Sequence, residues 1–216
     1  RSGQVIIGFE SYGQSTYETE YNSGIGSNGL TMARHELFHH DYADKYEETY
    51  APQIDRKYVY TGKFKVDDNV IIGGRNHPIG KLALSPTRTY LPVLNEILKN
   101  HNESIHGIIH ATGGGHTKVL KYCDAPVHIL KDNLFEVPPI FDIIQKSTDT
   151  SLTEMYKVFN MGTRLELYVD AEAAASIIEI SARFNIRAQV IGRVEGSKDN
   201  SMSVTVITNT ETLVYQ

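Results

Sequence analysis

The chain of 216 residues contains one cysteine and no tryptophan. With Cys123 as its single thiol it can form no internal disulfide, and an unpaired thiol suits a reducing compartment. No stretch approaches the roughly 18 consecutive apolar residues that a membrane-spanning helix needs. The N-terminus also lacks the charged and apolar regions of a signal peptide. These absences exclude a disulfide scaffold and predict a soluble, cytoplasmic protein with no membrane partner.

Runs of lysine or arginine are also missing, and the formal net charge is −5. Proteins that bind nucleic acid usually carry a basic face, so we expect no nucleic-acid partner. Hydrophobic residues make up 40% and charged residues 22% of the chain, which is typical of a globular protein with a core of its own. The sequence begins at Arg1 without a methionine and enters a strand-like run almost at once, so we expect a fragment or a processed chain.

Strand-like and helix-like segments alternate along most of the sequence. Short β-branched runs bounded by glycine or polar residues predict strands, and apolar residues three and four apart predict amphipathic helices. The alternation predicts an α+β fold with α/β-type order, in which a mixed β-sheet is packed with helices. The predicted strands cover residues 4–9, 57–60, 105–111, 127–130, 164–169, 188–194 and 203–208. The predicted helices cover residues 30–38, 90–99, 117–122, 138–144, 153–158 and 171–184.

Two segments do not fit this alternation. Residues 10–28 are rich in Gly, Ser, Tyr and Asn and predict a long loop, and loops of that length inside a domain are usually functional or mobile. Residues 42–80 are polar, rich in tyrosine and punctuated by glycine. We interpret them as an insertion on the surface of the core.

The segment His35-Glu36-Leu37-Phe38-His39 matches the zinc-protease pattern of two histidines four residues apart with a glutamate between them. On one helix the two imidazoles would share a face, but a catalytic zinc also needs a third protein ligand and an open position. Residues 41–46 give no sign of a second ligand-bearing helix. We therefore interpret the segment as the exposed, polar end of an amphipathic helix and predict no metal ligand.

Residues 24–29, Gly-Ile-Gly-Ser-Asn-Gly, match the dinucleotide-binding fingerprint letter for letter. In that motif the glycines directly follow a strand, and an acidic residue that holds the ribose comes about 20 positions later. Here a long loop separates the glycines from the strand, and no strand with such an acidic end follows. The glycine loop before a helix remains a candidate anion site, because free backbone N–H groups and the helix dipole meet there.

Five segments occur in a distinctive order. They are Ser-Gly-Ile-Gly-Ser-Asn-Gly at 23–29, Pro-Thr-Arg-Thr-Tyr at 86–90, His-Ala-Thr-Gly-Gly-Gly at 110–115, Glu-Met-Tyr-Lys-Val-Phe-Asn-Met-Gly at 154–162, and Ile-Gly-Arg-Val at 191–194. In order and spacing they resemble the C-terminal domain of the aminoimidazole ribonucleotide (AIR) synthetase family, also named phosphoribosylformylglycinamidine cyclo-ligase. Residues 154–162 are the segment most particular to that family. One departure stands out: the family usually carries a histidine where Gly26 stands.

The resemblance implies that residues 1–216 form this C-terminal domain, with a partly ferredoxin-like fold, and that the N-terminal ATP-binding domain is absent from the chain. The full-length family member is a homodimer that makes AIR from formylglycinamidine ribonucleotide in de novo purine biosynthesis. It is an ATP-dependent ligase that forms a C–N bond to close a ring. ATP and Mg²⁺ are bound mainly by the N-terminal domain, so we expect the isolated fragment to be inactive.

For the substrate the resemblance implies a site built from glycine loops and small polar side chains, because backbone N–H groups can then approach phosphate closely. It assigns no catalytic residue. The implied substrate-binding residues are Ser23, Gly24, Ser27, Asn28, Gly29, His110, Thr112, Gly113, Gly114, Gly115 and Asn160. Without the resemblance the same residues describe a flexible loop, a tight strand-to-helix turn and a helix-end cap. Arg88 is a further charge partner for a ligand or a solvated helix residue.

Two alternatives remain at this point. The first is a non-catalytic binding or regulatory module of the same ATP-using superfamily, which Gly26 in place of histidine favours and the retained Ser27-Asn28-Gly29 opposes. The second is a related superfamily enzyme such as formylglycinamidine synthetase.

Overall fold

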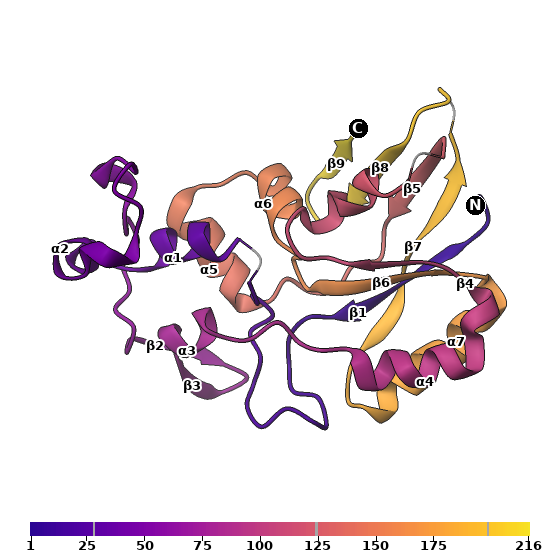
Figure 1. Ribbon diagram of the computed structural model, residues 1–216, viewed down its shortest axis with the longest axis horizontal. Helices are drawn as coiled ribbons and strands as arrows, with labels where there is room; N and C mark the ends of the chain where they lie inside the picture. Colours follow the sequence, from indigo (N-terminus) through magenta and orange to yellow (C-terminus); the bar gives the residue numbers. More distant parts are fainter. Residues whose placement is uncertain (28, 124, 198) are drawn as a thin grey trace.

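A seven-stranded sheet forms the centre of the computed structural model, which describes residues 1–27, 29–123, 125–197 and 199–216 (Figure 1). Neighbouring strands run antiparallel except for one parallel pair, β5 and β8. The predicted α+β fold with a mixed sheet is therefore confirmed. The strands, in their order across the sheet, are β4 (Ile105–His110), β6 (Thr163–Val169), β1 (Val5–Glu10), β7 (Ala188–Gly196), β5 (Val127–Lys131), β8 (Ser203–Ile207) and β9 (Thr212–Tyr215).

The half of the sheet made of β4, β6, β1 and β7 has ferredoxin-like topology. Along the chain its elements follow the order β1, α4 (Leu91–His101), β4, β6, α7 (Ala174–Arg183) and β7, which is the βαββαβ order of that fold. Helices α4 and α7 lie together on one face of the sheet (Figure 1). Successive side chains of a strand point to opposite faces, so Ile7 and Phe9 pack under these helices while Ile6 packs on the other side.

The other face of the sheet is covered by three elements from the second half of the chain. They are the 3-10 helix η4 (Gly115–Lys121), α5 (Pro139–Thr148) and α6 (Leu152–Val158). Pro139 begins α5, where a proline is tolerated because its missing N–H would have no helical partner. Ile129 and Ile191 of the sheet share a buried cluster with Ile140 and Phe159 of this layer.

A lobe built from residues 30–83 extends from one end of the sheet, at the left of Figure 1. Helix α1 packs against α5, and Val59 and Tyr60 are buried in the same cluster as Leu37. The lobe consists of α1 (Leu30–Leu37), α2 (Asp41–Lys45), the 3-10 turns η1 (Glu47–Thr49) and η2 (Arg56–Tyr58), the hairpin β2 (Asn69–Ile72) and β3 (Arg75–Pro78), and α3 (Ile79–Ala83). Two further 3-10 turns are η3 (Asn102–Ser104) and η5 (Ala171–Ala173).

Several local predictions were wrong. Residues 57–60 contain a 3-10 turn and extended backbone instead of a strand, because Asp55 accepts a hydrogen bond from the Lys57 N–H and starts the turn. The helix expected at 117–122 is the 3-10 helix η4. Strand β9, the hairpin β2–β3 and the short helices α2 and α3 were not predicted.

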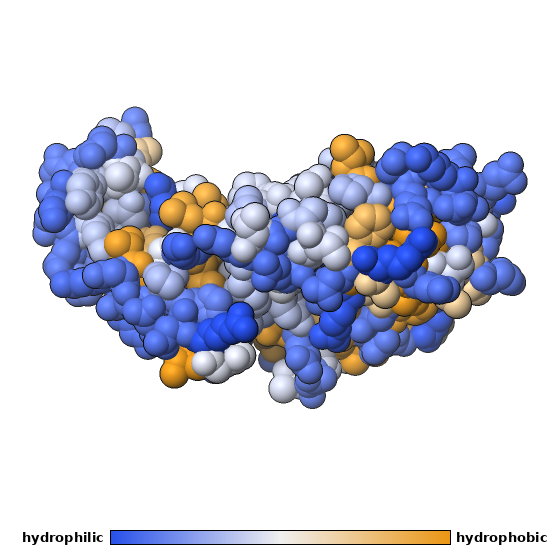
Figure 2. All heavy atoms as spheres, turned by 90° about the horizontal axis from the view of Figure 1, so that it is seen from below, coloured by the Kyte–Doolittle hydropathy of each residue, from blue (hydrophilic) through white to orange (hydrophobic). Residues whose placement is uncertain are grey.

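The surface seen from below is mostly hydrophilic, with apolar side chains gathered in small patches (Figure 2). No helix in the described part of the chain combines the length and the apolar character that crossing a bilayer requires.

Candidate functional site

Hydrogen bonds from its buried side hold the first part of the first glycine-rich loop, residues 22–27, in place. The hydroxyl of Ser23 donates to the Leu82 carbonyl at 2.7 Å, and the Ser23 N–H donates to the Ser85 hydroxyl at 3.0 Å. Gly24 has φ +85°, and a Cβ there would lie 2.4 Å from the Ser11 hydroxyl oxygen. Ser23 and Gly24 are both buried, so they shape the loop from inside and leave its outer surface to the residues that follow.

The outer part of this loop begins at Ser27, which is exposed. Its N–H donates to the Thr87 hydroxyl at 3.1 Å, and the two hydroxyl oxygens lie 3.4 Å apart. Gly29 precedes α1 with φ +60°, and a Cβ there would lie 2.5 Å from the Phe159 ring. The predicted residue Asn28 lies outside the described residues.

The second glycine-rich segment follows β4 and leads into η4. Gly114 and Gly115 both have positive φ, and a Cβ on Gly115 would lie 2.4 Å from the Phe159 carbonyl oxygen. Gly113 is exposed, and a Cβ there would meet no atom within 4 Å. The Thr112 hydroxyl accepts a hydrogen bond from the Lys118 ammonium group. In the described part of the chain nothing accepts a hydrogen bond from the N–H groups of Gly113 and Gly114, which therefore remain available to an acceptor from outside.

The two segments, almost ninety positions apart in sequence, are joined by one buried side chain, Arg164 of β6. Its Nη2 donates to the carbonyls of Gly24 and Ile25 at 2.7 and 2.9 Å, and its Nη1 donates to the carbonyl of Ala111 at 3.4 Å. Arg164 is 1% exposed. The loop that carries Ser27 and the turn that carries Gly113 thus lie on either side of one guanidinium group.

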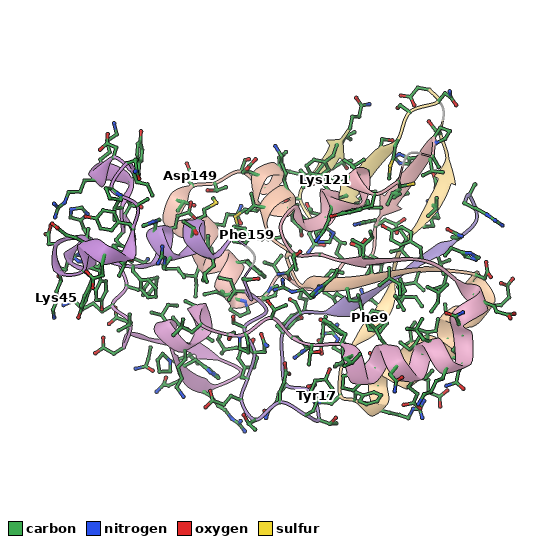
Figure 3. The ribbon with its side chains drawn as sticks, in the orientation of Figure 1. Phe9, Tyr17, Lys45, Lys121, Asp149 and Phe159 are labelled. Carbon is green, nitrogen blue, oxygen red and sulfur yellow. The ribbon has the colours of Figure 1, made fainter. Side chains whose placement is uncertain are left out.

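Asn160 also connects the same two segments, through hydrogen bonds in the protein interior. Its Nδ2 donates to the Gly24 carbonyl at 2.9 Å, and its own carbonyl lies 2.9 Å from Nε2 of His116, directly after Gly115. Its Oδ1 accepts from the Gly162 N–H at 3.0 Å, and the side chain is fully buried. Its neighbour Phe159 lies where the lobe meets the sheet (Figure 3). Asn160 therefore supports the loops and has no surface of its own to offer a ligand.

Positive charge dominates this region. Burial lowers the pKa of Arg164 to about 10, which leaves it charged at neutral pH. Desolvation, followed by the charges of Arg164 and Lys118, lowers the pKa of His110. Desolvation, Lys121 and Arg164 lower the pKa of Lys118. In the described residues no carboxylate lies within 4.0 Å of Arg164 or Lys118, so the region would attract an anion.

The site residues predicted from the sequence do not include Arg164, Lys118 or Thr87. A signal was present for Arg164, because it stands in a strand whose neighbours on both sides are apolar or short, where an arginine must find buried partners. Lys118 and Thr87 carried no such signal, since a lysine in a short helix and a threonine in a loop are usually solvated.

Arg88 is 3% exposed and precedes α4, so it is not a solvated helix residue. Its Nε and Nη2 donate to the two carboxylate oxygens of Glu18 at 3.0 and 2.8 Å, and its Nη1 donates to the Glu10 carbonyl at 3.1 Å. Nearby, the Tyr17 hydroxyl donates to the Thr89 carbonyl at 2.6 Å, and Tyr17 projects beside α4 (Figure 3). These contacts hold the beginning of the long loop, up to Glu18, against the segment that precedes α4.

The zinc-protease pattern does not have the geometry that its chemistry needs. Helix α1 ends at Leu37 and Phe38 is extended, so His35 and His39 do not share a helix face. His35 is buried and its Nδ1 accepts from the Tyr60 N–H at 3.3 Å, which corrects our expectation of an exposed helix end. Across the described residues, no group of three or more His, Cys, Asp or Glu side chains is placed to hold a metal ion.

The chain was compared with known proteins. The family described as "AIR synthase related protein, C-terminal domain" matches residues 1–205. The chain belongs to this family. Among curated relatives it is 32% identical over 197 residues to the phosphoribosylformylglycinamidine cyclo-ligase of Methanocaldococcus jannaschii, which covers 91% of this chain and 46% of that protein. The cyclo-ligase of Methanococcus vannielii is 37% identical (90% and 45%), and that of Syntrophus aciditrophicus is 33% identical (94% and 49%).

This member of the AIR synthase related C-terminal domain family spans about half the length of the curated relatives that it matches. These relatives are named cyclo-ligases, which does not favour a formylglycinamidine synthetase or a non-catalytic module. Two solved structures also resemble the chain: T. maritima PurL complexed with ATP (11% identical, TM-score 0.46, 99% of this chain and 24% of that one) and E. coli HypE (13%, TM-score 0.48, 100% and 50%).

Proposed function

We propose that this chain is the substrate-binding C-terminal part of a phosphoribosylformylglycinamidine cyclo-ligase. One observation carries the proposal: two glycine-rich segments, each predicted from the sequence to contact the substrate, lie against the same guanidinium group, and no described residue accepts a hydrogen bond from the N–H groups of Gly113 and Gly114. Backbone N–H groups with a nearby positive charge are the standard means of binding a phosphate ester. The curated relatives support the identity of that ester as formylglycinamidine ribonucleotide.

The reaction of such an enzyme consumes one ATP. The γ-phosphoryl group moves to the formyl oxygen of the substrate, so that a poor leaving group becomes phosphate and ADP is released. The amidine nitrogen then attacks the activated carbon, the C–N bond closes the imidazole ring, and inorganic phosphate departs. Catalysis of this kind depends mostly on positioning and on stabilising phosphoryl charge.

In this scheme the described residues hold the substrate and take no covalent part. Exposed Ser27 and Gly113 form the surface that meets the phosphate or ribose, and Thr112 and Lys118 act as a hydrogen-bonded donor pair at its edge. His110 is held largely neutral near pH 7 because its pKa is lowered, so it can donate or accept one hydrogen bond. Ser23, Gly24, Gly115 and Asn160 contribute by fixing the backbone.

The curated relatives are about twice as long as this chain, and we assign the remaining parts of the activity to the half of those proteins that this chain does not match. We place ATP, Mg²⁺ and the dimer contacts mainly there, with residues 1–216 forming one domain and residues 42–80 as an insertion. A cytoplasmic location belongs to the same proposal.

The proposal is tested by assaying AIR formation from formylglycinamidine ribonucleotide and ATP. The full-length protein should form AIR with release of one phosphate per turnover, and the 216-residue chain alone should form none. Full-length protein that binds the substrate without turning it over would contradict the enzyme assignment, and AIR formation by the isolated chain would contradict the division of labour.

A further inference from the structure

Arg164 has the properties of a buried charge that lacks its counter-ion. Its side chain is 1% exposed, its Nε is buried without a hydrogen-bond partner among the described residues, and no described carboxylate lies within 4.0 Å. A buried cation is costly unless it is paired. Three backbone carbonyls satisfy Nη1 and Nη2 in part, but they supply no negative charge.

The guanidinium group of Arg164 occupies space that a side chain at position 26 would otherwise fill. A Cβ at Gly26 would lie 2.6 Å from Nη2 of Arg164 and 2.7 Å from the Thr87 hydroxyl oxygen. Real Cβ atoms do not approach other atoms that closely, so position 26 must lack a side chain while Arg164 keeps this position. The glycine at position 26 of the first loop and the arginine at position 164 of β6 therefore depend on each other.

The guanidinium also determines how the two loops face each other. Because its fork is planar and rigid, hydrogen bonds from Nη2 to Gly24 and Ile25 and from Nη1 to Ala111 fix the separation of the two chain segments. Ser27 follows the first segment by two residues, and Gly113 follows the second by two. Displacing Arg164 would release both outer surfaces at once.

We propose that Arg164 is the positioning residue of a phosphate site: it locks the loop that presents Ser27 against the turn that presents Gly113 and Gly114, and its charge selects a dianionic phosphate monoester. The identity of the monoester as the substrate's ribose phosphate rests on the proposed function. The role of Arg164 rests on the contacts described above.

His110 provides a direct readout in the 216-residue chain. It is flanked by Arg164 on β6, by Lys118 on η4 and by the ring of Tyr90, whose centroid lies 6.2 Å from its own. Proton NMR titration of its imidazole, identified with a His110→Gln variant, would be recorded without ligand and with inorganic phosphate, ribose 5-phosphate or ATP. We expect phosphate and ribose 5-phosphate to raise the His110 pKa, because a bound anion favours the imidazolium.

In Arg164→Met the pKa of free His110 should be higher than in the wild type, since one neighbouring cation is gone, and phosphate should bind at least tenfold more weakly. Arg164→Lys, which keeps the charge but loses the fork, should fall between the two. Arg183→Met, on the opposite face of the sheet in α7 and paired with Glu96, is the matched control and should behave as wild type.

Phosphate binding that is unchanged in Arg164→Met would overturn the inference, as would tighter binding of ATP than of ribose 5-phosphate. If Arg164→Met does not fold, Gly26→Ala serves instead, because its Cβ displaces the guanidinium and should weaken phosphate binding in the same way. Arg164-dependent binding by a protein whose full-length form makes no AIR would leave this inference intact and refute only the proposed function.

Discussion

At the scale of single residues, the glycines of the two loops are present for different reasons. Gly29 and Gly115 leave room for the ring and the carbonyl of Phe159, whereas Gly26 leaves room for a guanidinium group. Gly113 leaves room for nothing within the chain. The space beside Gly113 is therefore open to a group from outside the described chain.

The pairing of Gly26 with Arg164 makes a testable prediction. Gly26→His alone should destabilise the chain by about 2–4 kcal/mol, because the new side chain collides with the guanidinium and takes a positive φ. Gly26→His combined with Arg164→Gly should be more stable than the sum of the two single changes predicts, since the imidazole can occupy the vacated space, although the carbonyls of Gly24, Ile25 and Ala111 lose their donor. Urea unfolding would measure both, and a double variant that is less stable than the two single changes predict together would contradict the pairing.

Some of these residue roles could be predicted from the sequence and others could not. The glycine-rich segments were predicted as anion contacts because backbone N–H groups are free in such loops and because the family resemblance singles these segments out. Arg164 was not recognised, because its function depends on Gly24 and Ala111 being brought together by the fold. Asn160 was named as a substrate contact, and its burial makes it a support of the loops.

At the scale of elements, a buried polar network connects η4 with strands β5 and β6. Lys131 donates to Glu166 at 2.5 Å and to the His116 carbonyl at 3.0 Å, and the Tyr168 hydroxyl donates to Glu166 at 2.9 Å. None of these side chains is more than 6% exposed. Burial, together with the charge of Lys131, lowers the pKa of His116 well below its ordinary value, so that histidine is neutral. The network fixes η4 directly after the Gly113–Gly115 turn.

A double-mutant cycle tests how the network acts. Lys131→Met alone should cost about 3–5 kcal/mol of stability, because it leaves the Glu166 carboxylate buried and unpaired. Lys131→Met with Glu166→Leu should cost less than the single change, since neither charge remains, although the Tyr168 hydroxyl then loses its acceptor. Chemical denaturation of the four proteins gives the coupling, and additive effects of the two changes would show that the pair acts independently.

Helices and strands with one clearly buried face could be predicted from the sequence, and short, half-exposed ones could not. Strands β1, β4, β6 and β7 and helices α4 and α7 were predicted because β-branched runs and helical spacing coincide with their burial. A short helix was expected at residues 117–122, and its few apolar positions could not tell an α-helix from the 3-10 helix η4 that the structure has. Strand β9 and the hairpin β2–β3 are short and half exposed, so their pairing depends on neighbours that a local pattern does not contain.

At the scale of the whole molecule, the chain is a ferredoxin-like half-sheet extended by three strands, with a helical lobe at one end (Figure 1). The two glycine-rich segments meet between the lobe and the sheet, where β6 contributes Arg164 and α6 leads into Phe159 and Asn160. The lobe holds the first loop through α3 and Ser85, and the sheet holds the second through β4. The candidate site therefore lies where the lobe and the sheet pack together.

The most direct measurement is the steady-state kinetics of the full-length protein carrying Gly113→Ala, with Gly196→Ala as the matched control. Neither Cβ would meet an atom of the chain within 4 Å, and neither glycine has a positive φ, so both variants should fold like the wild type. If phosphate of the substrate approaches the backbone at Gly113, the added methyl group should raise KM for formylglycinamidine ribonucleotide by about tenfold, roughly 1.4 kcal/mol. KM for ATP should stay the same, and Gly196→Ala should be unchanged in both. An unaltered KM for formylglycinamidine ribonucleotide in Gly113→Ala would contradict a substrate site at these loops.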